Sequence, residues 1–301
     1  MDLYIKSYLA YLSSRKNYST NTIYAYKHDL EDFLNYLDKI HIKDLNQATI
    51  ASLQDYMASI NVSNSTYNRK ITSIKGYYCY QLKRNNNIKI NIEDIEHVKK
   101  EKIYPHTLRK DEIGEIIKCI DNNVIGIRDK SIIMFLYISG LRVSELINLT
   151  FTDINFQEGY IRCIGKGNKE KIIVVGDLLN ISLSNYLKNS RNIILRGIKC
   201  NYIYCNEDGE KLSRQTINNL IKKYAKKANI KRNVSPHTFR HCFATHMMEN
   251  GADIRSVQEM LGHSDISTTQ IYTNITNQTI KNEYFSKIKD PFHLITNKED
   301  K

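Results

Sequence analysis

Long apolar runs are missing from this sequence of 301 residues. A membrane-spanning helix needs roughly 18 or more consecutive apolar residues, and no segment provides them. The first residues alternate between apolar and polar types, which does not predict a secretory signal peptide. The two absences predict a cytoplasmic protein that has no membrane partner.

Paired cysteines and excess acidic residues are also missing. The six cysteines form no Cys-x-x-Cys pair, so they indicate reduced cytosolic thiols and not a disulfide framework. Only 32 Asp+Glu stand against 44 Lys+Arg, which gives a formal net charge of +12. This excess favours nucleic acid as the partner, because neutralised phosphates release counterions. Charge alone leaves a basic but unspecialised protein equally open.

Proline is scarce, and its three positions mark breaks in the chain. Pro105 lies in a charged stretch without apolar periodicity, which indicates an interdomain linker over residues 99–108. The chain is long enough for two domains. We therefore expect one domain at residues 1–98 and a second at residues 109–301.

The first domain has apolar residues at the three- and four-residue steps that are typical of amphipathic helices. One such run consists of Ile23, Tyr26, Leu30, Phe33, Leu34 and Leu37, and a second of Tyr67, Ile71, Ile74 and Tyr78. Residues 19–22 offer capping side chains for the first run. Arg69, Lys70 and Lys75 fall outside the second run, so we predict a helical bundle with basic faces.

The second domain mixes helical and strand patterns. Helical spacing occurs at residues 113–120 and again at 217–228, where lysines 222, 223, 226 and 227 form a polar face. Residues 131–138 are almost wholly apolar, which indicates a buried segment. Residues 160–164 and 171–175 flank a turn that contains two glycines, which predicts a β-hairpin. The predicted fold class is mainly α, with a small antiparallel β-sheet in the C-terminal domain.

Four short segments carry candidate chemistry. They are Gly-Leu-Arg-Val-Ser-Glu-Leu at 140–146, Gly-Lys-Gly-Asn-Lys at 165–169, His-Thr-Phe-Arg-His at 237–241 and Leu-Gly-His-Ser-Asp at 261–265, which Tyr272 follows. Together they offer guanidinium and ammonium cations, proton carriers and a hydroxyl nucleophile. Such groups suit an attack on a phosphodiester.

Each of these residues also has a simpler interpretation. Arg142 has Glu145 nearby, and a salt bridge between them is at least as well supported as a phosphate contact, although both can coexist. Lys166 and Lys169 lie in a turn, where lysines are usually solvated, although one could donate a proton to a leaving oxygen. Tyr272 is one of 21 tyrosines, so only its position after the other segments singles it out.

The histidines require a zinc site to be considered. His237, Arg240 and His241 share one helical face, and Ser235-Pro236 suits a helix start that would attract an anion. No His-Glu-x-x-His pattern or matching carboxylate set accompanies them, so we expect no metal. His246 falls on the apolar side of the same helix, which indicates packing, and His263 could simply cap a helix.

The order and spacing of these segments resemble the Xer-type tyrosine recombinases, also called phage-type integrases, over the whole chain. Arg142 matches the family's first catalytic arginine, and Lys166, 24 residues later, matches the hairpin lysine that acts as general acid. His237 and Arg240 match the His-x-x-Arg pair, and His263 matches the histidine of Leu-Gly-His. Tyr272, nine residues after His263, matches the nucleophile.

The resemblance implies a site-specific DNA recombinase that works through a 3′-phosphotyrosyl intermediate, without metal, nucleotide cofactor or small-molecule substrate. Residues 1–98 would be the core-binding domain and residues 109–301 the catalytic domain, closing as a two-domain clamp around double-stranded DNA. Four protomers would act together, as a homotetramer or with a paralogue. The task would be to resolve chromosome dimers or to integrate and excise a mobile element.

Other functions stay open at this point. A type IB topoisomerase-like enzyme would use similar chemistry to nick and close DNA without exchanging strands. A DNA-binding protein with an idle catalytic fold is the alternative without activity, although the complete residue set argues against it. A zinc phosphohydrolase is the weakest alternative, because the histidines lack a suitable ligand set.

Overall fold

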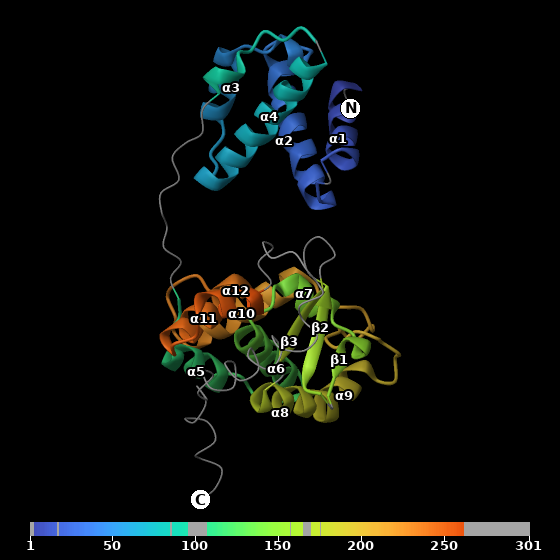
Figure 1. Cartoon of the computed structure of the whole chain (residues 1–301), viewed down its shortest axis with the longest axis vertical. Helices are drawn as coiled ribbons and strands as arrows, with labels where there is room; N and C mark the ends of the chain where they lie inside the picture. Colours follow the sequence, from blue (N-terminus) through green and yellow to red (C-terminus); the bar gives the residue numbers. More distant parts are fainter. Residues whose placement is uncertain are drawn as a thin grey trace, which may run out of the picture. The chain divides into compact units, whose positions relative to one another are not determined.

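The chain divides into two compact units, residues 1–103 and 104–301. The computed structural model describes residues 3–16, 18–84, 86–95, 107–156, 158–164, 170–174 and 176–261. The predicted linker at 99–108 therefore lies outside the described residues except for its last two positions. The described residues of each unit are mostly helical (Figure 1). Each unit has a hydrophobic core of its own.

In the N-terminal unit, the described residues form a bundle of four helices with two short 3₁₀ turns. Its elements are α1 (Leu3–Ser14), α2 (Thr20–Lys39), η1 (Leu45–Gln47), α3 (Ile50–Ser59), α4 (Asn64–Lys83) and η2 (Ile92–Asp94). The predicted N-cap of α2 is confirmed, because the Ser19 hydroxyl accepts a hydrogen bond from Thr22 N. Leu30, Phe33 and Leu37 of α2 are buried in the core, as their spacing predicted.

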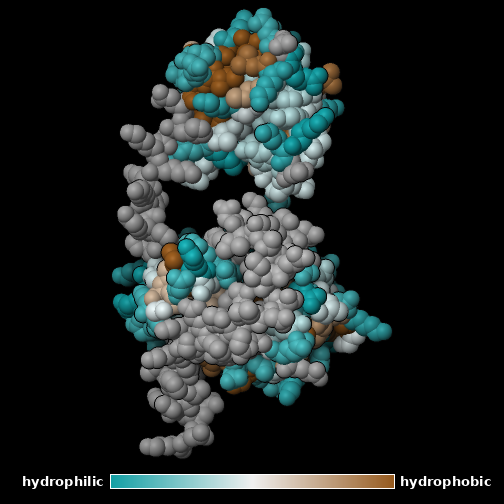
Figure 2. All heavy atoms as spheres, in the orientation of Figure 1, coloured by the Kyte–Doolittle hydropathy of each residue, from teal (hydrophilic) through white to brown (hydrophobic). Residues whose placement is uncertain are grey.

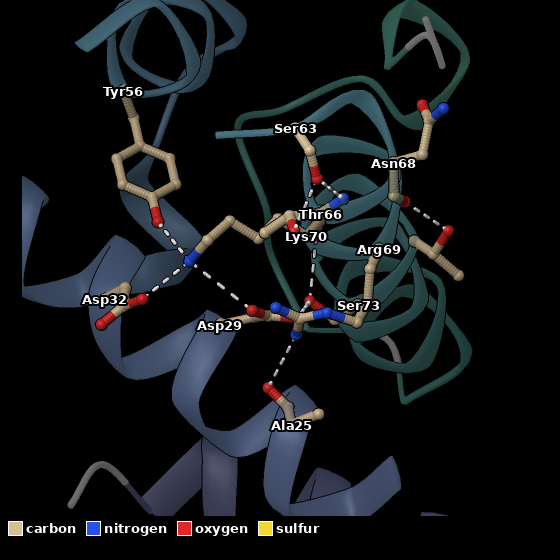
Figure 3. A network of polar contacts seen from close by, with 11 residues as sticks. Ala25, Asp29, Asp32, Tyr56, Ser63, Thr66, Asn68, Arg69, Lys70 and Ser73 are labelled. Carbon is tan, nitrogen blue, oxygen red and sulfur yellow. Dashed lines mark hydrogen bonds and ion pairs between the residues drawn. The ribbon is translucent and has the colours of Figure 1, made fainter. Parts of the chain in front are cut away.

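A buried network of charges joins α2, α3 and α4 (Figure 3). Lys70 Nζ lies 2.7 Å from Asp32 Oδ2 and 3.5 Å from Asp29 Oδ1, and it donates to Tyr56 Oη at 3.1 Å. Arg69 forms a short ion pair with Asp29. The prediction that Lys70 belongs to a basic outer face is therefore wrong. The apolar spacing of α4 carries no information about carboxylates that a different helix supplies.

The C-terminal unit contains the remaining helices and the sheet. Its helices are α5 (Lys110–Lys118), α6 (Val124–Ser139), α7 (Val143–Asn148), α8 (Asp177–Tyr186), α9 (Asn192–Leu195), α10 (Arg214–Lys227), α11 (Pro236–Glu249) and α12 (Ile254–Leu261). A 3₁₀ turn covers Phe151–Asp153, and a π-helical turn at Leu187–Arg191 joins α8 to α9. The helices predicted around 113–120 and 217–228 correspond to α5 and α10, and the four lysines of α10 are exposed as expected.

Helix α6 is the central element of this unit. Every residue from Ser131 to Ser139 is buried, so the helix is covered on all sides and not along one stripe. It packs against α8 and α11, and Figure 1 shows these helices around it. The buried segment predicted at 131–138 is thus confirmed.

The sheet has three antiparallel strands in the order β1 (Ile154–Asn155), β2 (Tyr160–Ile164) and β3 (Glu170–Val174). The hairpin prediction is confirmed by the register of β2 and β3, in which Ile161 pairs with Ile173 and Cys163 with Lys171. In β3, Lys171 and Ile173 are buried while Glu170 and Ile172 are exposed. The mainly α fold with a small antiparallel sheet agrees with the predicted fold class.

On the face of the molecule shown in Figure 2, most of the described residues are hydrophilic. Figure 2 shows a largely hydrophilic face on the N-terminal unit, with an apolar area near α3. Within the described ranges, each helix is too short or too polar to cross a lipid bilayer.

Candidate active site

The turn between α6 and α7 places the first arginine. Helix α6 ends at Gly140, whose φ of 60° and ψ of 21° are left-handed, a conformation that glycine adopts without strain. A Cβ atom at Gly140 would lie 2.6 Å from Phe243 Cδ1 and 2.9 Å from Leu261 Cδ2. Glycine is therefore required both by the turn and by the close approach of α11 and α12. Arg142 follows directly as the N-cap of α7.

Arg142 and Glu145 form the ion pair that the sequence suggested. Arg142 Nη1 donates to Glu145 Oε1 at 2.8 Å, and Arg142 N donates to Glu145 Oε2 at 2.9 Å. The Glu145 side chain is 3% exposed and that of Arg142 is 30% exposed. The carboxylate thus holds the guanidinium from the buried side and leaves part of it accessible to a second anion.

Helix α11 begins at the serine-proline pair, as predicted. Ser235 is the N-cap and accepts a hydrogen bond from Thr238 N, and Pro236 occupies the first turn. His237 and His241 are exposed near this helix start. Partial burial lowers the pKa of His237, and the positive charges of His241, Arg240 and Arg142 lower it further. At neutral pH His237 is therefore a neutral imidazole that can accept a proton.

Arg240 connects α11 to the ends of two other helices. Its Nη1 donates to Gly140 O and its Nη2 to Leu261 O, each at 2.6 Å. The residue is 7% exposed. The pKa of Arg240 is lowered to about 10, mainly by burial and also by the positive charge of Arg142, while Glu145 acts in the opposite direction. Arg240 remains charged at neutral pH, and the two carbonyl oxygens that accept its hydrogen bonds carry no formal charge.

The apolar side of α11 packs as the sequence predicted. Phe239, Cys242, Phe243 and Met247 are buried, and His246 is buried with them. Tyr137 Oη lies 2.9 Å from His246 Nδ1. The prediction that His246 is a packing residue is confirmed. Among the described residues no three His, Cys, Asp or Glu side chains gather as metal ligands would.

Lys171 belongs to the same group of charges and was missed by sequence reasoning. It is 7% exposed, and its electrostatic neighbours are Glu145, Arg240, Cys163 and Arg142. Its Nζ has no hydrogen-bond partner within the described part of the chain. The alternation of side chains along the strands could have identified Lys171. Ile161 and Cys163 indicate the buried face of β2, and Lys171 pairs with Cys163 across the hairpin.

The structure brings Arg142, Arg240 and Glu145 together, with His237 in their electrostatic neighbourhood. Lys166, His263 and Tyr272, the other predicted site residues, lie outside the described residues, as does Lys169. In the sequence, Lys166 falls between the ends of β2 and β3, and His263 follows Leu261 by two positions. The described part of the site therefore combines the buried guanidinium of Arg240 and the half-buried guanidinium of Arg142 with one buried carboxylate, which suits binding of an anion such as a phosphodiester.

Comparison with known families identifies the class of protein that this fold and site define. The model of the phage integrase family matches residues 106–279, and that of the phage integrase N-terminal SAM-like domain matches residues 5–85. The chain belongs to the phage integrase family and is a tyrosine recombinase, an enzyme that performs site-specific DNA recombination.

Particular relatives are similar over nearly the full length. Tyrosine recombinase XerD of Staphylococcus epidermidis is 39% identical, with 94% of this chain and 98% of the relative covered. The XerD of Staphylococcus aureus is 36% identical with the same coverage. The resemblance predicted from the sequence motifs is thereby confirmed.

Solved structures share the fold. The XerH site-specific recombinase in a post-cleavage complex with its palindromic difH substrate has a TM-score of 0.70 at 21% identity, covering 92% of this chain and 83% of the other. The Tn1549 transposon integrase in complex with circular intermediate DNA has a TM-score of 0.64 at 18% identity, covering 93% and 94%.

Proposed function

We propose that this recombinase cuts and rejoins double-stranded DNA through a 3′-phosphotyrosyl intermediate. Tyr272 Oη attacks the scissile phosphorus, and the bond from phosphorus to the 5′ oxygen breaks. Lys166 gives a proton to the departing 5′ oxygen, while His237 assists the movement of the tyrosine proton. Arg142, Arg240 and His263 stabilise the charge on the pentavalent transition state.

Rejoining is the reverse of cleavage. The 5′ hydroxyl of another strand attacks the phosphotyrosyl bond and releases Tyr272. The bond energy of the phosphodiester is kept in the covalent intermediate, so neither a nucleotide cofactor nor a metal is needed. The protein supplies the positive charge that Mg²⁺ or Zn²⁺ supplies in other phosphoryl-transfer sites.

The observation that carries this proposal is the convergence of Arg142 and Arg240 on the α6–α7 turn. Both guanidinium groups lie in a partly dry site with Glu145 as the nearby carboxylate. A buried cation is costly unless an anion compensates it. A phosphodiester bound at this turn would receive charge-assisted hydrogen bonds from both arginines.

Assembly on DNA follows from the same proposal. Residues 1–98 act as a core-binding domain, residues 99–108 as a linker and residues 109–301 as the catalytic domain of a clamp around the duplex. Four protomers, identical or paired with a paralogue, work on two duplexes in the cytoplasm. The DNA-bound state of the XerH and Tn1549 structures supports a DNA partner for this chain. The products would be resolved chromosome dimers or an integrated or excised mobile element.

A suicide substrate tests the chemistry. A duplex nicked near the scissile phosphate should trap a covalent protein–DNA adduct in EDTA, visible as a retarded band on a denaturing gel. Tyr272→Phe should abolish the adduct while DNA affinity stays within about threefold, because only the attacking oxygen is lost. Tyr24→Phe, which alters a tyrosine that is 62% exposed on α2, is the matched control and should form adduct normally.

Three outcomes would change the proposal. A normal adduct with Tyr272→Phe would assign the nucleophile to another residue. Cleavage lost in EDTA and restored by one metal would favour a phosphohydrolase. An adduct with supercoil relaxation but no joined partner strands would favour the topoisomerase IB-like alternative.

A further inference from the structure

Lys171 occupies a position in the sheet where a charged side chain is energetically unfavourable. It alternates with the exposed Glu170 and Ile172, so it faces the same buried side as Ile173. Its cross-strand partner, Cys163, is also buried. An isolated ammonium on the core side of a sheet loses its hydration, which costs several kcal/mol unless an anion compensates it.

The carboxylate near Lys171 is already occupied. Glu145 Oε1 accepts from Arg142 Nη1, and Glu145 Oε2 accepts from the backbone N of Arg142. Lys171 Nζ makes no hydrogen bond to any described residue. It receives attraction from Glu145 at longer range, together with repulsion from Arg142 and Arg240.

The charges of this group do not balance. Arg142, Arg240 and Lys171 are three cations, and Glu145 is the one carboxylate among the described residues that act electrostatically on Lys171. Strand β3 packs against α12, whose buried residues Val257, Met260 and Leu261 are apolar. Glu259 of α12 is half-buried, and it is not among the charges that act on Lys171, which are those of Glu145, Arg240, Cys163 and Arg142.

We infer that Lys171 is a further cation of the recombinase site, which holds the scissile phosphate together with Arg142 and Arg240. This inference rests on the proposed function, because the phosphate supplies the negative charge that the three cations lack. Lys171, on the buried face of β3, is then a group that binds the substrate phosphate. Its role differs from that of Lys166, which donates a proton to the leaving oxygen.

The ionisation of Lys171 supports the same assignment. Burial lowers its pKa to about 8, and the positive charges of Arg240 and Arg142 act in the same direction, while Glu145 opposes them. In the free protein the ammonium therefore loses its proton as the pH rises through about 8. A bound phosphate raises the pKa of Lys171 again, so DNA binding is coupled to proton uptake above that pH.

Replacing Lys171 by methionine separates a substrate-binding role from a structural one. Lys171→Met removes the charge and keeps an unbranched chain that suits an apolar sheet face. We expect single-turnover adduct formation at pH 7 to slow by about 10²–10³-fold, the scale of losing one charge-stabilising donor. The melting temperature of the DNA-free protein should stay the same or rise, because an uncompensated buried charge is removed.

The conservative variant and a surface control complete the series. Lys171→Arg keeps the charge and should recover most of the rate that Lys171→Met loses. Lys118→Met makes the same chemical change at a side chain that is 50% exposed on α5, and its rate and melting temperature should stay close to wild type. Wild-type adduct formation in the same experiment tests the proposed function independently of Lys171.

The pH profile isolates Lys171 from Lys166. A substrate with a 5′-bridging sulfur has a thiolate leaving group that needs no proton from Lys166. On this substrate the wild-type kcat/KM should fall as the pH rises through about 8, because the Lys171 ammonium loses its proton. In Lys171→Arg the side chain stays protonated, so kcat/KM should not fall below pH 9. Lys171→Met with a rate within about twofold of wild type, or a loss of rate that parallels a loss of melting temperature, would overturn the inference.

Discussion

Two clusters of charge, one in each unit, each contain a lysine of low exposed fraction, and the pKa values of these two lysines shift in opposite directions. Lys70 is 6% exposed and Lys171 is 7% exposed. Burial acts to lower the pKa of both. At Lys70, hydrogen bonds to Asp32 and Tyr56 outweigh burial and raise the pKa, whereas at Lys171 burial prevails and lowers it. The hydrogen-bond partners of each lysine, together with how fully its ammonium is desolvated, therefore set the direction of its pKa shift.

The balance of charge in the two clusters explains why the pKa values of Lys70 and Lys171 shift in opposite directions. In the N-terminal unit, Arg69 and Lys70 face Asp29 and Asp32, so two cations meet two carboxylates. In the C-terminal unit, Arg142, Arg240 and Lys171 share Glu145. The first cluster is complete without a ligand and joins three helices. The second leaves positive charge for an anion, which is the property that binding a DNA phosphate requires.

The largest expected effect lies at Lys166, which falls between β2 and β3 in the sequence. Lys166→Ala should slow cleavage of ordinary DNA by about 10²–10⁴-fold, the usual value of a general acid. Most of this loss should vanish on the 5′-bridging sulfur substrate in single-turnover assays, because a thiolate leaves without a proton. Lys169→Ala, a change in the same turn, should lose little on either substrate.

This result would also sharpen the contrast between proton donors and fixed cations. The sulfur substrate should not restore the rate of Arg142→Ala, because this variant lacks a cation that stabilises the negative charge of the transition state. An equally slow Lys166→Ala with sulfur in place would make Lys166 a positioning residue.

The second prediction compares arginines in the two clusters. Arg142→Ala and Arg240→Ala should each slow single-turnover cleavage by about 10²–10³-fold. DNA affinity should weaken far less, because we expect the many other lysines to supply most of the phosphate contacts, and the salt slope should change by no more than about one unit. Arg69→Ala, in the balanced cluster, should leave the rate of the bound complex nearly unchanged. A loss of binding in step with the rate would make the site arginines anchors of DNA or of the fold.

The third prediction removes the buried carboxylate of the balanced cluster. Asp29→Ala should destabilise the protein by about 3–5 kcal/mol, because the buried Lys70 and the partly exposed Arg69 lose the buried carboxylate that they share. Chemical denaturation followed by circular dichroism measures this change. A loss below about 1 kcal/mol would show that water or Asp32 compensates the two cations, and the contrast between the clusters would fail.

The smallest effect is expected at the accessible partner of the same cluster. The Asp32 side chain is 55% exposed, so Asp32→Ala should cost at most about 1 kcal/mol of unfolding free energy, as for other solvent-screened ion pairs. Lys70 keeps Asp29 in this variant. The same denaturation experiment measures it, and a loss equal to that of Asp29→Ala would show that Asp32 is the principal partner of Lys70.

Much of the fold followed from local pattern. The spacing of Leu30, Phe33 and Leu37 predicted the buried side of α2, and Ser19 and Ser235 marked two helix starts. The pairing of β2 with β3 followed from two strand-like segments, 160–164 and 171–175, on either side of a glycine-containing turn sequence, whereas the register came from the structure. These features depend on neighbours within a few residues, which a sequence displays directly.

The candidate site was predicted in part. The motifs identified Arg142 and its partner Glu145, and the apolar side of α11 identified His246 as a packing residue. The apolar periodicity wrongly predicted that Lys70 lies on an outer face, and it did not identify Lys171 as a site residue. In both cases the deciding groups are distant in sequence: Asp29 and Asp32 lie about 40 positions from Lys70, and Arg240 lies 69 positions from Lys171.

The sequence by itself therefore determined the helices, the hairpin, the motif residues and the family. Only the tertiary structure decided which charges are buried together and which remain uncompensated. The physical reason is that amphipathic periodicity is a property of adjacent turns, whereas the energy of a charge depends on its distance in space to other charges and on the water it loses. Lys70 and Lys171 belong to the same residue type, and the carboxylates around them give one a structural role and leave the other ready for phosphate.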